Sequence, residues 1–389
     1  MNQFLIIKYT LLTMVIFYIF FIIYFKLRYP FWSKQPIFYY HDIGNLIYPK
    51  GIIETSLPNC GNKVNQSIIF KKGSHLSSKE IKEIKKLLTN NYMTDKLEKY
   101  TPSNNDFIDH LICRNMPSRV SLYYDKQKNQ LIGTMTSVYK QMILPSNYLD
   151  VGYVDYLCID ENHRGKNIAG KIIENHYIRE RYQQKTSVYL FKHEGFSRPF
   201  VPLTIYNTYF YKLNLFEKII LTQQSLNISL ITKNNISMLY DLQTNLQKNI
   251  TNKSSCFKCV IMDEFEHLSY LIEKKHIFIF ALIENMKPKA FYFFRNNYTT
   301  YNDDKSIECF SCIKYDKDIE TNKLVLGFYL AIDYLKTIDK YKILILENIA
   351  DSRYLTKNMD QQPYHYSKYY YYLYNYAMKP IASRNIVII

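Results

Sequence analysis

The sequence predicts an α+β (mixed α/β) protein in which two similar domains follow an N-terminal transmembrane helix. Three observations lead to this class: an uncharged apolar run near the N-terminus, helix patterns alternating with strand patterns, and the return of that order in the second half. We therefore assign residues 1–28 to a membrane anchor, 29–225 to a first domain and 226–389 to a second, joined near residues 224–234.

The apolar run predicts a helix that crosses a membrane. Residues 9–25 carry no charge, and a helix needs about 20 mainly apolar residues to span a bilayer. A cleaved signal peptide is the alternative, but no small-x-small cleavage site follows the run. Basic residues cluster behind the run, at Lys26, Arg28 and Lys34. The positive-inside rule then predicts a single-pass membrane protein whose large C-terminal part is cytoplasmic.

The charge balance first suggests a protein that binds nucleic acid or a membrane surface. Lys and Arg number 50 against 34 Asp and Glu, a formal net charge of +16 over 389 residues. The chain has no block of about five like charges, and its abundant Lys, Asn, Ile, Tyr and Phe fit an A/T-rich genome. We therefore expect no nucleic-acid partner. The odd number of cysteines, 7, fits a reducing compartment better than a disulfide framework.

Periodicity predicts the same order of elements in both halves. In the first half we expect helices at residues 78–90 and 165–184, with strands at 119–125, 130–139, 153–159 and 187–191. In the second half we expect helices at 263–274 and 322–337, with strands at 276–283, 290–295, 307–313 and 343–347. The Tyr-rich residues 364–376 fit a strand with one solvent-exposed face.

One segment of the first half has the pattern of a phosphate-binding turn. Residues 154–170 read as an apolar strand, a polar turn, and a basic, small-residue entry to a helix. Backbone N–H groups at a helix start attract phosphate, and Arg164 and Lys166 add positive charge. Ala169 and Gly170 permit close approach of the backbone to a ligand. An ordinary strand-turn-helix connection with solvated charges is the alternative.

Residues 164–169, Arg-Gly-Lys-Asn-Ile-Ala, resemble the acyl-CoA pyrophosphate loop of the GNAT acyltransferase superfamily, with Asn167 in place of its first glycine. Residues 155–170 align without a gap with the matching segment of N-myristoyltransferases. Three further segments resemble that family, in its order: Tyr-Pro-Phe-Trp-Ser-Lys-Gln-Pro-Ile at 29–37, Leu-Leu-Thr-Asn-Asn-Tyr at 87–92, and Tyr-Tyr-Leu-Tyr-Asn at 371–375 with an apolar C-terminus.

The resemblance implies two tandem GNAT-like domains, the first binding acyl-CoA and the second on the peptide-substrate side. The implied activity is transfer of a myristoyl (fatty acyl) group from acyl-CoA to the N-terminal glycine amine of a protein. The implied partners are myristoyl-CoA as co-substrate, with no permanently bound cofactor, and proteins that begin with glycine.

The resemblance also implies site residues. The backbone N–H groups of Tyr156 and Leu157 would stabilise the oxyanion that forms when an amine attacks the thioester. The main-chain carboxylate of Ile389 would accept a proton from the amine, and the apolar residues 386–389 suit its burial. The implied acyl-CoA contacts are Tyr29, Phe31, Trp32, Arg164, Gly165, Lys166, Asn167, Ile168 and Ala169. The alternatives are an exposed terminal carboxylate and, around Trp32, an aromatic belt at the membrane surface.

The chain departs from the family pattern at three places. Residues 93–99 have mixed charge where the family has an acidic loop, Phe210 stands where the family has a histidine, and the segment after Pro380 is a few residues shorter. These departures leave two alternatives open: a GNAT-fold N-acetyltransferase acting on another amine, and a catalytically inactive membrane-tethered binding protein.

Two Cys-x-x-Cys pairs form the one metal-like pattern in the sequence, Cys256 with Cys259 and Cys309 with Cys312. Their separation is long for a zinc ribbon, and residues i and i+3 of a strand face opposite sides. Ordinary thiols are therefore the favoured interpretation, and no metal site is assigned. The residues His163 and His193 have no partners at ligand spacing, and we expect both in loops.

Overall fold

The structure is a computed structural model that describes residues 3–58, 65–93, 97–111, 118–125, 127–184, 186–217, 226–252, 254 and 256–389. Its α-helices are α1 (Gln3–Arg28), α2 (Ile43–Ile47), α3 (Ser78–Asn91), α4 (Asn104–Asp109), α5 (Ile168–Gln184), α6 (Ser237–Thr251), α7 (Phe265–Glu273), α8 (Thr321–Ile338) and α9 (Ser352–Asn358). Its strands are β1 (Gly51–Ile52), β2 (Ile68–Lys72), β3 (Glu98–Tyr100), β4 (Arg119–Asp125), β5 (Gln130–Leu144), β6 (Asn147–Ile159), β7 (Val188–Glu194), β8 (Thr204–Lys212), β9 (Leu226–Leu230), β10 (Cys259–Met262), β11 (Ile277–Glu284), β12 (Lys287–Tyr301), β13 (Asp304–Lys314), β14 (Ile343–Glu347), β15 (His365–Tyr374), β16 (Tyr376–Ala377) and β17 (Ile386–Ile388).

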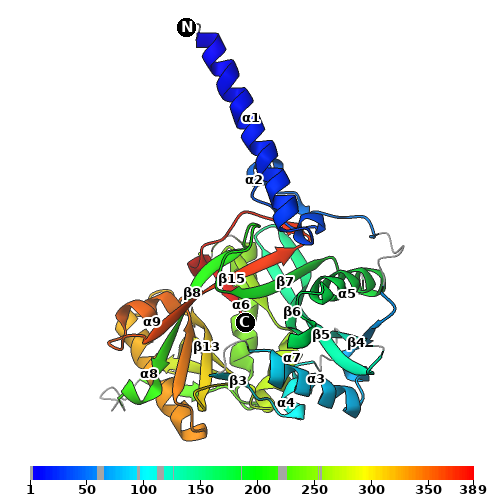
Figure 1. Cartoon of the computed structure of the whole chain (residues 1–389). Coiled ribbons are helices and arrows are strands. Elements are labelled where there is room, and N and C mark those ends of the chain that lie inside the picture. The colour runs from blue at the N-terminus through cyan, green and yellow to red at the C-terminus, as the bar shows by residue number, and fades with distance from the viewer. Residues whose placement is uncertain are drawn as a thin grey trace.

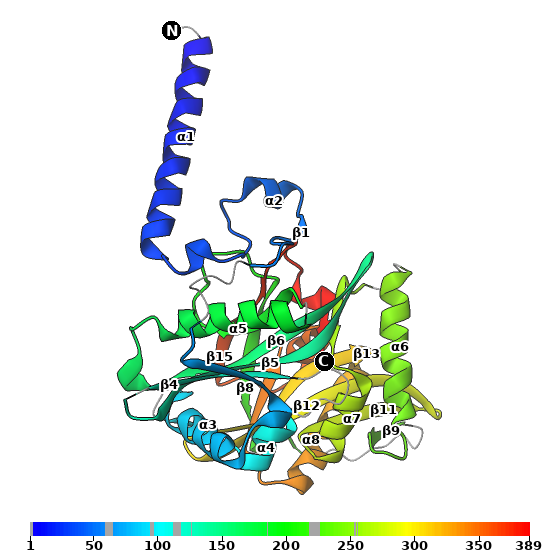
Figure 2. The same ribbon diagram turned by 90° about the vertical axis from the view of Figure 1, so that its right-hand side faces the viewer.

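One sheet of 15 strands runs through the body of the protein (Figures 1 and 2). Its main path is β17-β10-β5-β6-β7-β15-β8-β14-β13-β12-β11-β9, with β4 and β2 beside β5 and with β3 beside β12. Strands from the two sides of residue 225 therefore belong to one sheet, in which β15 lies between β7 and β8, and β10 lies beside β5. The division into domains at residues 225 and 226 stays a prediction, and part of the expected joint lies outside the described residues.

The helices form where the chain can bury one apolar face and satisfy the ends of its backbone. Helix α3 begins with a capping box, in which Ser77 accepts from the N–H of Glu80 and the Glu80 carboxylate accepts from the N–H of Ser77. Helix α5 packs on β4, β5 and β6, where Ile168 and Ile172 are buried. Helix α8 covers the other half of the sheet and buries Phe328 and Leu335. The expected α+β class is confirmed.

Most predicted elements lie within a few residues of their expected positions. Helix α5, however, begins at Ile168 rather than at residue 165, because Gly165 and Asn167 have φ values of 76° and 56°. A right-handed helix cannot include that conformation.

The expectation that residues 364–376 have one solvent-exposed face is wrong for the end of that strand. Tyr370 to Tyr374 are buried on both faces, since β15 lies between β7 and β8 in the middle of the sheet. The alternating pattern of an edge-facing strand therefore does not apply there.

Helix α1 projects from the body of the protein, and α2 lies beside its lower part (Figures 1 and 2). Almost every side chain of α1 is exposed, and Phe25 near its C-terminal end is the buried one. Among the described residues, α1 is the helix that is long and apolar enough to cross a membrane, a property that signal sequences share.

Candidate functional site

The pairing of β5 with β6 is interrupted by a bulge. The register shifts between Thr134 and Thr136 of β5, so that Tyr156 and Leu157 of β6 face a single residue of β5. The φ of Tyr156 is 51°, in the left-handed region that non-glycine residues rarely adopt. The two N–H groups expected to bind an oxyanion therefore lie at a break in regular strand pairing.

Asp155 lies directly beside this bulge. Its Oδ1 atom accepts the N–H of Tyr156 at 2.7 Å and the hydroxyl of Tyr92 at 3.0 Å. Burial raises the pKa of the Asp155 carboxyl above 3.8. One of the two expected donors is thus already bound to a carboxyl group. Asp155 is not among the predicted site residues, although an acidic residue within an apolar strand was the available signal.

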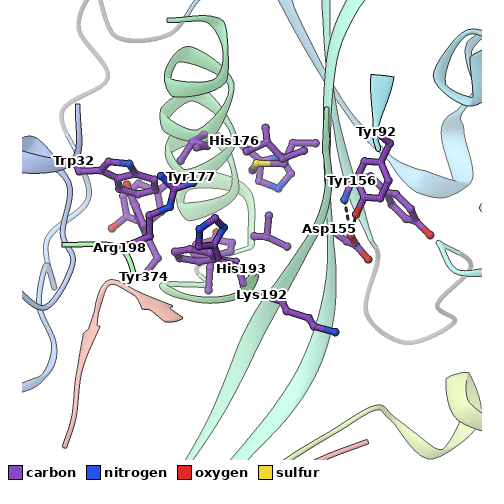
Figure 3. Close-up of a pocket in the computed structure, with 16 residues that line it drawn as sticks. Trp32, Tyr92, Asp155, Tyr156, His176, Tyr177, Lys192, His193, Arg198 and Tyr374 are labelled. Atoms are coloured by element: carbon purple, nitrogen blue, oxygen red, sulfur yellow. Dashed lines mark hydrogen bonds between the residues drawn. The ribbon is translucent and has the colours of Figure 1, made fainter. Parts of the chain in front are cut away.

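A cavity of about 290 Å³ opens beside the bulge, between β6, β7 and α5 (Figure 3). Figure 3 shows Trp32, Arg198 and Tyr374 on one side and Asp155, Tyr156 and Tyr92 on the other. The full lining is Trp32, Tyr92, Met135, Val154, Asp155, Tyr156, Leu157, Ile173, His176, Tyr177, Tyr189, Phe191, Lys192, His193, Arg198 and Tyr374. Aliphatic and aromatic side chains make up most of this wall, so the cavity suits an apolar ligand.

A second, more open hollow lies over the start of α5, and it contains most of the predicted pyrophosphate loop. Arg164, Gly165, Asn167, Ile168 and Ala169 line it, together with Phe31. Lys166 is exposed and does not line this hollow; its Nζ atom donates to the carbonyl of Asn162 at 3.2 Å.

The shape of the loop explains why asparagine replaces a glycine at position 167. Asn167 has a φ of 56°, and asparagine adopts the left-handed region more readily than most residues. Its Oδ1 atom would lie 2.5 Å from a Cβ added at Gly170, and Cδ2 of Phe31 would lie 2.8 Å from it. The loop, Gly170 and Phe31 are therefore packed closely enough that a side chain at residue 170 would displace them.

The three expected aromatic contacts lie in three different places. Phe31 lines the hollow over α5, whereas Trp32 lines the cavity beside the bulge and stacks on Phe191 with a ring distance of 6.2 Å. Tyr29 lines neither; its ring lies 5.5 Å from that of Phe25 at the base of α1. Consecutive residues Phe31 and Trp32 thus connect the two hollows.

The C-terminal residues are buried, as their apolar sequence predicts. Ile389 is 1% exposed, and β17 pairs in parallel with β10. A carboxylate oxygen of Ile389 accepts the N–H of Asp263 at 2.9 Å and Nζ of Lys140 at 3.2 Å. Nζ of Lys140 also lies 2.8 Å from Oδ2 of Asp263. Ile389 lines neither hollow, and its expected role as the base stays a prediction.

Tyr153 links this C-terminal group to the bulge. Nζ of Lys140 lies 5.7 Å from the centre of the Tyr153 ring, and Tyr153 is two residues from Asp155 on β6. Alternate residues of a strand point to the same face. A series of neighbouring side chains therefore leads across the sheet from the terminal carboxylate to the bulge. Its members are Lys140, Tyr153 and Asp155.

A cluster of two buried carboxylates and two half-buried basic side chains lies next to the cavity and was not predicted. Nζ of Lys192, which lines the cavity, is 2.5 Å from Oε1 of Glu347 and 3.4 Å from Oε1 of Glu308. Nε of Arg295 is 2.7 Å from Oε2 of Glu308. The signal in the sequence was a charged residue directly beside a run of apolar residues, clearest for Glu347, which follows Ile-Leu-Ile-Leu in β14.

The pKa values of the two carboxylates in this cluster are shifted in opposite directions. Burial opposes ionisation of Glu308, but Arg295 and Lys192 hold its pKa well below 4.5. Burial raises the pKa of Glu347 to about 7, although Lys192 acts against the change. The cluster therefore contains one group that exchanges protons near neutral pH.

His193 lies in strand β7 and lines the cavity, so the expectation that it lies in a loop is wrong. His163 lies in a short turn and its Nδ1 atom is 3.0 Å from Oδ1 of Asp160. Phe210 is buried and packs on Tyr301 with a ring distance of 5.6 Å.

The thiols of the two Cys-x-x-Cys pairs differ in exposure. Cys256 is exposed, whereas Cys259, Cys309 and Cys312 are buried. Within the part of the chain that the structure describes, no group of three or more His, Cys, Asp or Glu residues could hold a metal ion.

The part of the chain that contains the bulge and the loop matches a known protein family. Residues 54–190 match the family model of the N-terminal domain of myristoyl-CoA:protein N-myristoyltransferase. This range contains the bulge, α5 and the loop at residues 164–169. No curated protein sequence matches the chain.

The whole described chain is similar in fold to solved N-myristoyltransferases. One is the Saccharomyces cerevisiae enzyme with bound myristoyl-CoA, at a TM-score of 0.71 and 14% identity over 91% of this chain and 94% of that chain. Another, the same enzyme with bound myristoyl-CoA and inhibitors, has a TM-score of 0.67 and 16% identity over 93% and 94% of the two chains. The resemblance that the sequence motifs predict is confirmed, in sequence over residues 54–190 and in fold over the chain.

Proposed function

We propose that this chain, which has the N-myristoyltransferase fold, is an acyltransferase that transfers a myristoyl group from acyl-CoA to the N-terminal glycine amine of a protein. The observation that carries the proposal is the bulge at Tyr156 and Leu157, which lies within residues 54–190 and opens on a largely apolar cavity. Family match, fold and local geometry support the same chemistry.

In this proposal, the two hollows bind different parts of the acyl-CoA. The acyl chain occupies the cavity lined by Val154, Ile173 and Phe191, with its carbonyl at the bulge. The pyrophosphate lies over the start of α5, where backbone N–H groups of residues 165–169 and the helix dipole favour an anion. Phe31 lies beside this loop, and Trp32 packs where the two parts of the ligand meet.

The reaction forms a bond between the amine nitrogen and the acyl carbon and breaks the carbon–sulfur bond, so that CoA leaves as its thiol. The N–H groups of Tyr156 and Leu157 stabilise the oxyanion. The carboxyl of Asp155 accepts the Tyr156 N–H, and this hydrogen bond must break for the N–H to donate to the oxyanion. The attacking amine must be neutral, and the carboxylate of Ile389 is the proposed acceptor of its proton.

Helix α1 anchors the enzyme in a membrane, with the body of the protein on the cytoplasmic side. The exposed apolar surface of α1 and the basic residues Lys26, Arg28 and Lys34 behind it support this arrangement. Acyl-CoA and a newly acylated protein would then both lie close to lipid.

The test uses the full chain in lipid nanodiscs with labelled myristoyl-CoA and a peptide that begins with glycine. We expect acylation of this peptide and none of a matched peptide whose first residue is N-acetylated glycine. Faster turnover with acetyl-CoA than with myristoyl-CoA would select the N-acetyltransferase instead. Binding of myristoyl-CoA without turnover of any peptide would identify a binding protein, and no acyl-CoA binding would refute the proposal.

A further inference from the structure

We infer that residues 40–48, which we call the wedge, enter the same bilayer leaflet as the lower half of α1. The lipid acyl chains of that leaflet are the inferred partner of the wedge. The wedge contains α2 and lies beside α1 in both views (Figures 1 and 2). The inference rests on the proposed membrane anchor and goes beyond it, because a single spanning helix does not by itself require a second inserted element.

The charges of α1 define the depth of the membrane around it. Lys8 and Lys26 are the charged residues on either side of residues 9–25. At about 1.5 Å of rise per residue they lie roughly 27 Å apart along the axis, close to the thickness of a hydrocarbon core. Lys26 therefore marks the interface nearest the body of the protein.

Contacts with α1 place the start of the wedge on the lipid side of that interface. The hydroxyl of Tyr18 donates to the carbonyl of His41 at 2.7 Å. The His41 ring lies 6.0 Å from that of Phe21 and 5.1 Å from that of Phe25. Phe25 directly precedes Lys26, and Tyr18 precedes it by two helical turns, or roughly 12 Å, so His41, which contacts both, lies between the interface and roughly 12 Å into the hydrocarbon, a range that includes the depth at which interfacial helices are buried.

The side chains that the wedge presents outward are apolar. Ile43 is 54% exposed, Leu46 41%, Ile47 56% and Tyr48 82%. Such a cluster on a five-residue helix is costly to expose to water and favourable to place in lipid.

Most polar side-chain groups of the wedge are paired locally; Nδ1 of His41 is the exception and has no hydrogen-bond partner within the described residues. Asp42 accepts the backbone N–H and the side-chain amide of Asn45, at 3.1 Å and 2.5 Å. Asn45 is buried and its Oδ1 atom accepts the N–H of Lys50 at 3.1 Å. A segment that enters lipid needs this internal pairing, because hydrocarbon offers no hydrogen-bond partners.

Basic residues surround the place where the wedge meets the body of the protein. Lys26, Arg28, Lys34 and Lys50 are all exposed there. Their positive charge complements the anionic headgroups of a cytoplasmic leaflet. The open hollow between α1 and the wedge, lined by Phe17, Tyr18, Phe20, Phe21, Tyr24, Tyr40, His41 and Ile43, then takes up lipid acyl chains.

Tryptophan fluorescence in vesicles tests this inference. The full chain, whose one Trp supplies the baseline, is reconstituted in vesicles of phosphatidylcholine and phosphatidylserine, with phosphatidylcholine brominated on its acyl chains as quencher. The probes on the wedge are Ile47→Trp and Tyr48→Trp. Phe17→Trp reports on the anchor, and Met286→Trp, on the β11–β12 hairpin away from α1, is the water-exposed control (Figure 2).

We expect brominated lipid to quench both wedge probes within about twofold of the Phe17→Trp probe, and iodide in the water to quench only Met286→Trp. Quenching of both wedge probes by iodide and not by lipid, with Phe17→Trp still quenched by lipid, would overturn the inference and leave the anchor intact. An unquenched Phe17→Trp probe would instead refute the anchor and the wedge together.

Discussion

Nζ of Lys140 lies 3.2 Å from the terminal carboxylate oxygen of Ile389 and 2.8 Å from Oδ2 of Asp263. One largely buried ammonium group thus lies between two carboxylates that would otherwise repel each other. The three groups connect β5, the end of β10 and the C-terminus of the chain, so the position of the terminal carboxylate depends on Lys140.

Replacing Lys140 by methionine should lower the free energy of unfolding by about 3–5 kcal/mol, because two buried carboxylates lose their counter-charge. Lys99→Met is the matched control. Lys99 pairs with Asp303 at 2.8 Å in an exposed ion pair, and its loss should cost less than about 1 kcal/mol. Urea denaturation of the two variants measures the difference, and equal effects would contradict the role given to Lys140.

Adding one alanine after Ile389 should abolish peptide acylation without changing the affinity for acyl-CoA. The extension moves the charged carboxylate away from Lys140 and the N–H of Asp263, and it replaces the terminal carboxylate at Ile389 with an amide. Ile389→Leu keeps both the carboxylate and the apolar side chain and should retain turnover. Single-turnover kinetics and calorimetry separate the two effects; normal turnover of the extended chain would rule out Ile389 as the base.

Replacing Glu347 by glutamine should change how stability depends on pH. Burial raises the Glu347 pKa from 4.5 to about 7, so its protonated form is favoured in the folded state. Its stabilising contribution is present below pH 4.5 and is lost as the pH rises through about 7. The free energy of unfolding of the parent chain, relative to Glu347→Gln, should fall across this interval.

Glu308→Gln provides the opposite case. The Glu308 pKa lies well below 4.5, so ionised Glu308 contributes stability above that pH, and the contribution is lost only on acidification. Unfolding measured in denaturant at a series of pH values distinguishes the two variants. Parallel pH profiles for both would show that the two carboxylates do not titrate separately.

Replacing Asn167 by valine should weaken acyl-CoA binding and cost about 1–2 kcal/mol of stability, because a β-branched residue is strained at a φ of 56°. Asn167→Gly permits the same backbone conformation and should bind acyl-CoA nearly as well as the parent chain. Titration calorimetry with myristoyl-CoA compares the two variants. Equal loss in both would mean that the Asn167 side chain, rather than the loop conformation, is what the ligand requires.

Local sequence patterns predicted the elements that position the site. The pattern of residues 154–170 predicted a strand, a turn and a helix, and these became the end of β6, the loop and α5. Most residues of the loop also line a hollow together with Phe31, and their contact with acyl-CoA stays a prediction. Periodicity and helix-start chemistry act over short distances, so one sequence suffices to find them.

Contacts between distant strands could not be predicted in the same way. Lys140 and Ile389 are separated by 249 residues, and Lys192 and Glu347 by 155. Each pair meets only because of the strand order, which periodicity does not specify. The left-handed φ of Tyr156 likewise depends on the register between β5 and β6 rather than on the Tyr156 residue type.

The place of β15 in the sheet has a consequence for biosynthesis. Residues 365–374 lie between β7 and β8, whose own residues are made much earlier. During translation β7 and β8 leave the ribosome with their shared central position empty, and the cavity wall at Tyr374 is absent. Each of these two strands then has an unpaired edge until β15 is made, and unpaired strand edges promote aggregation.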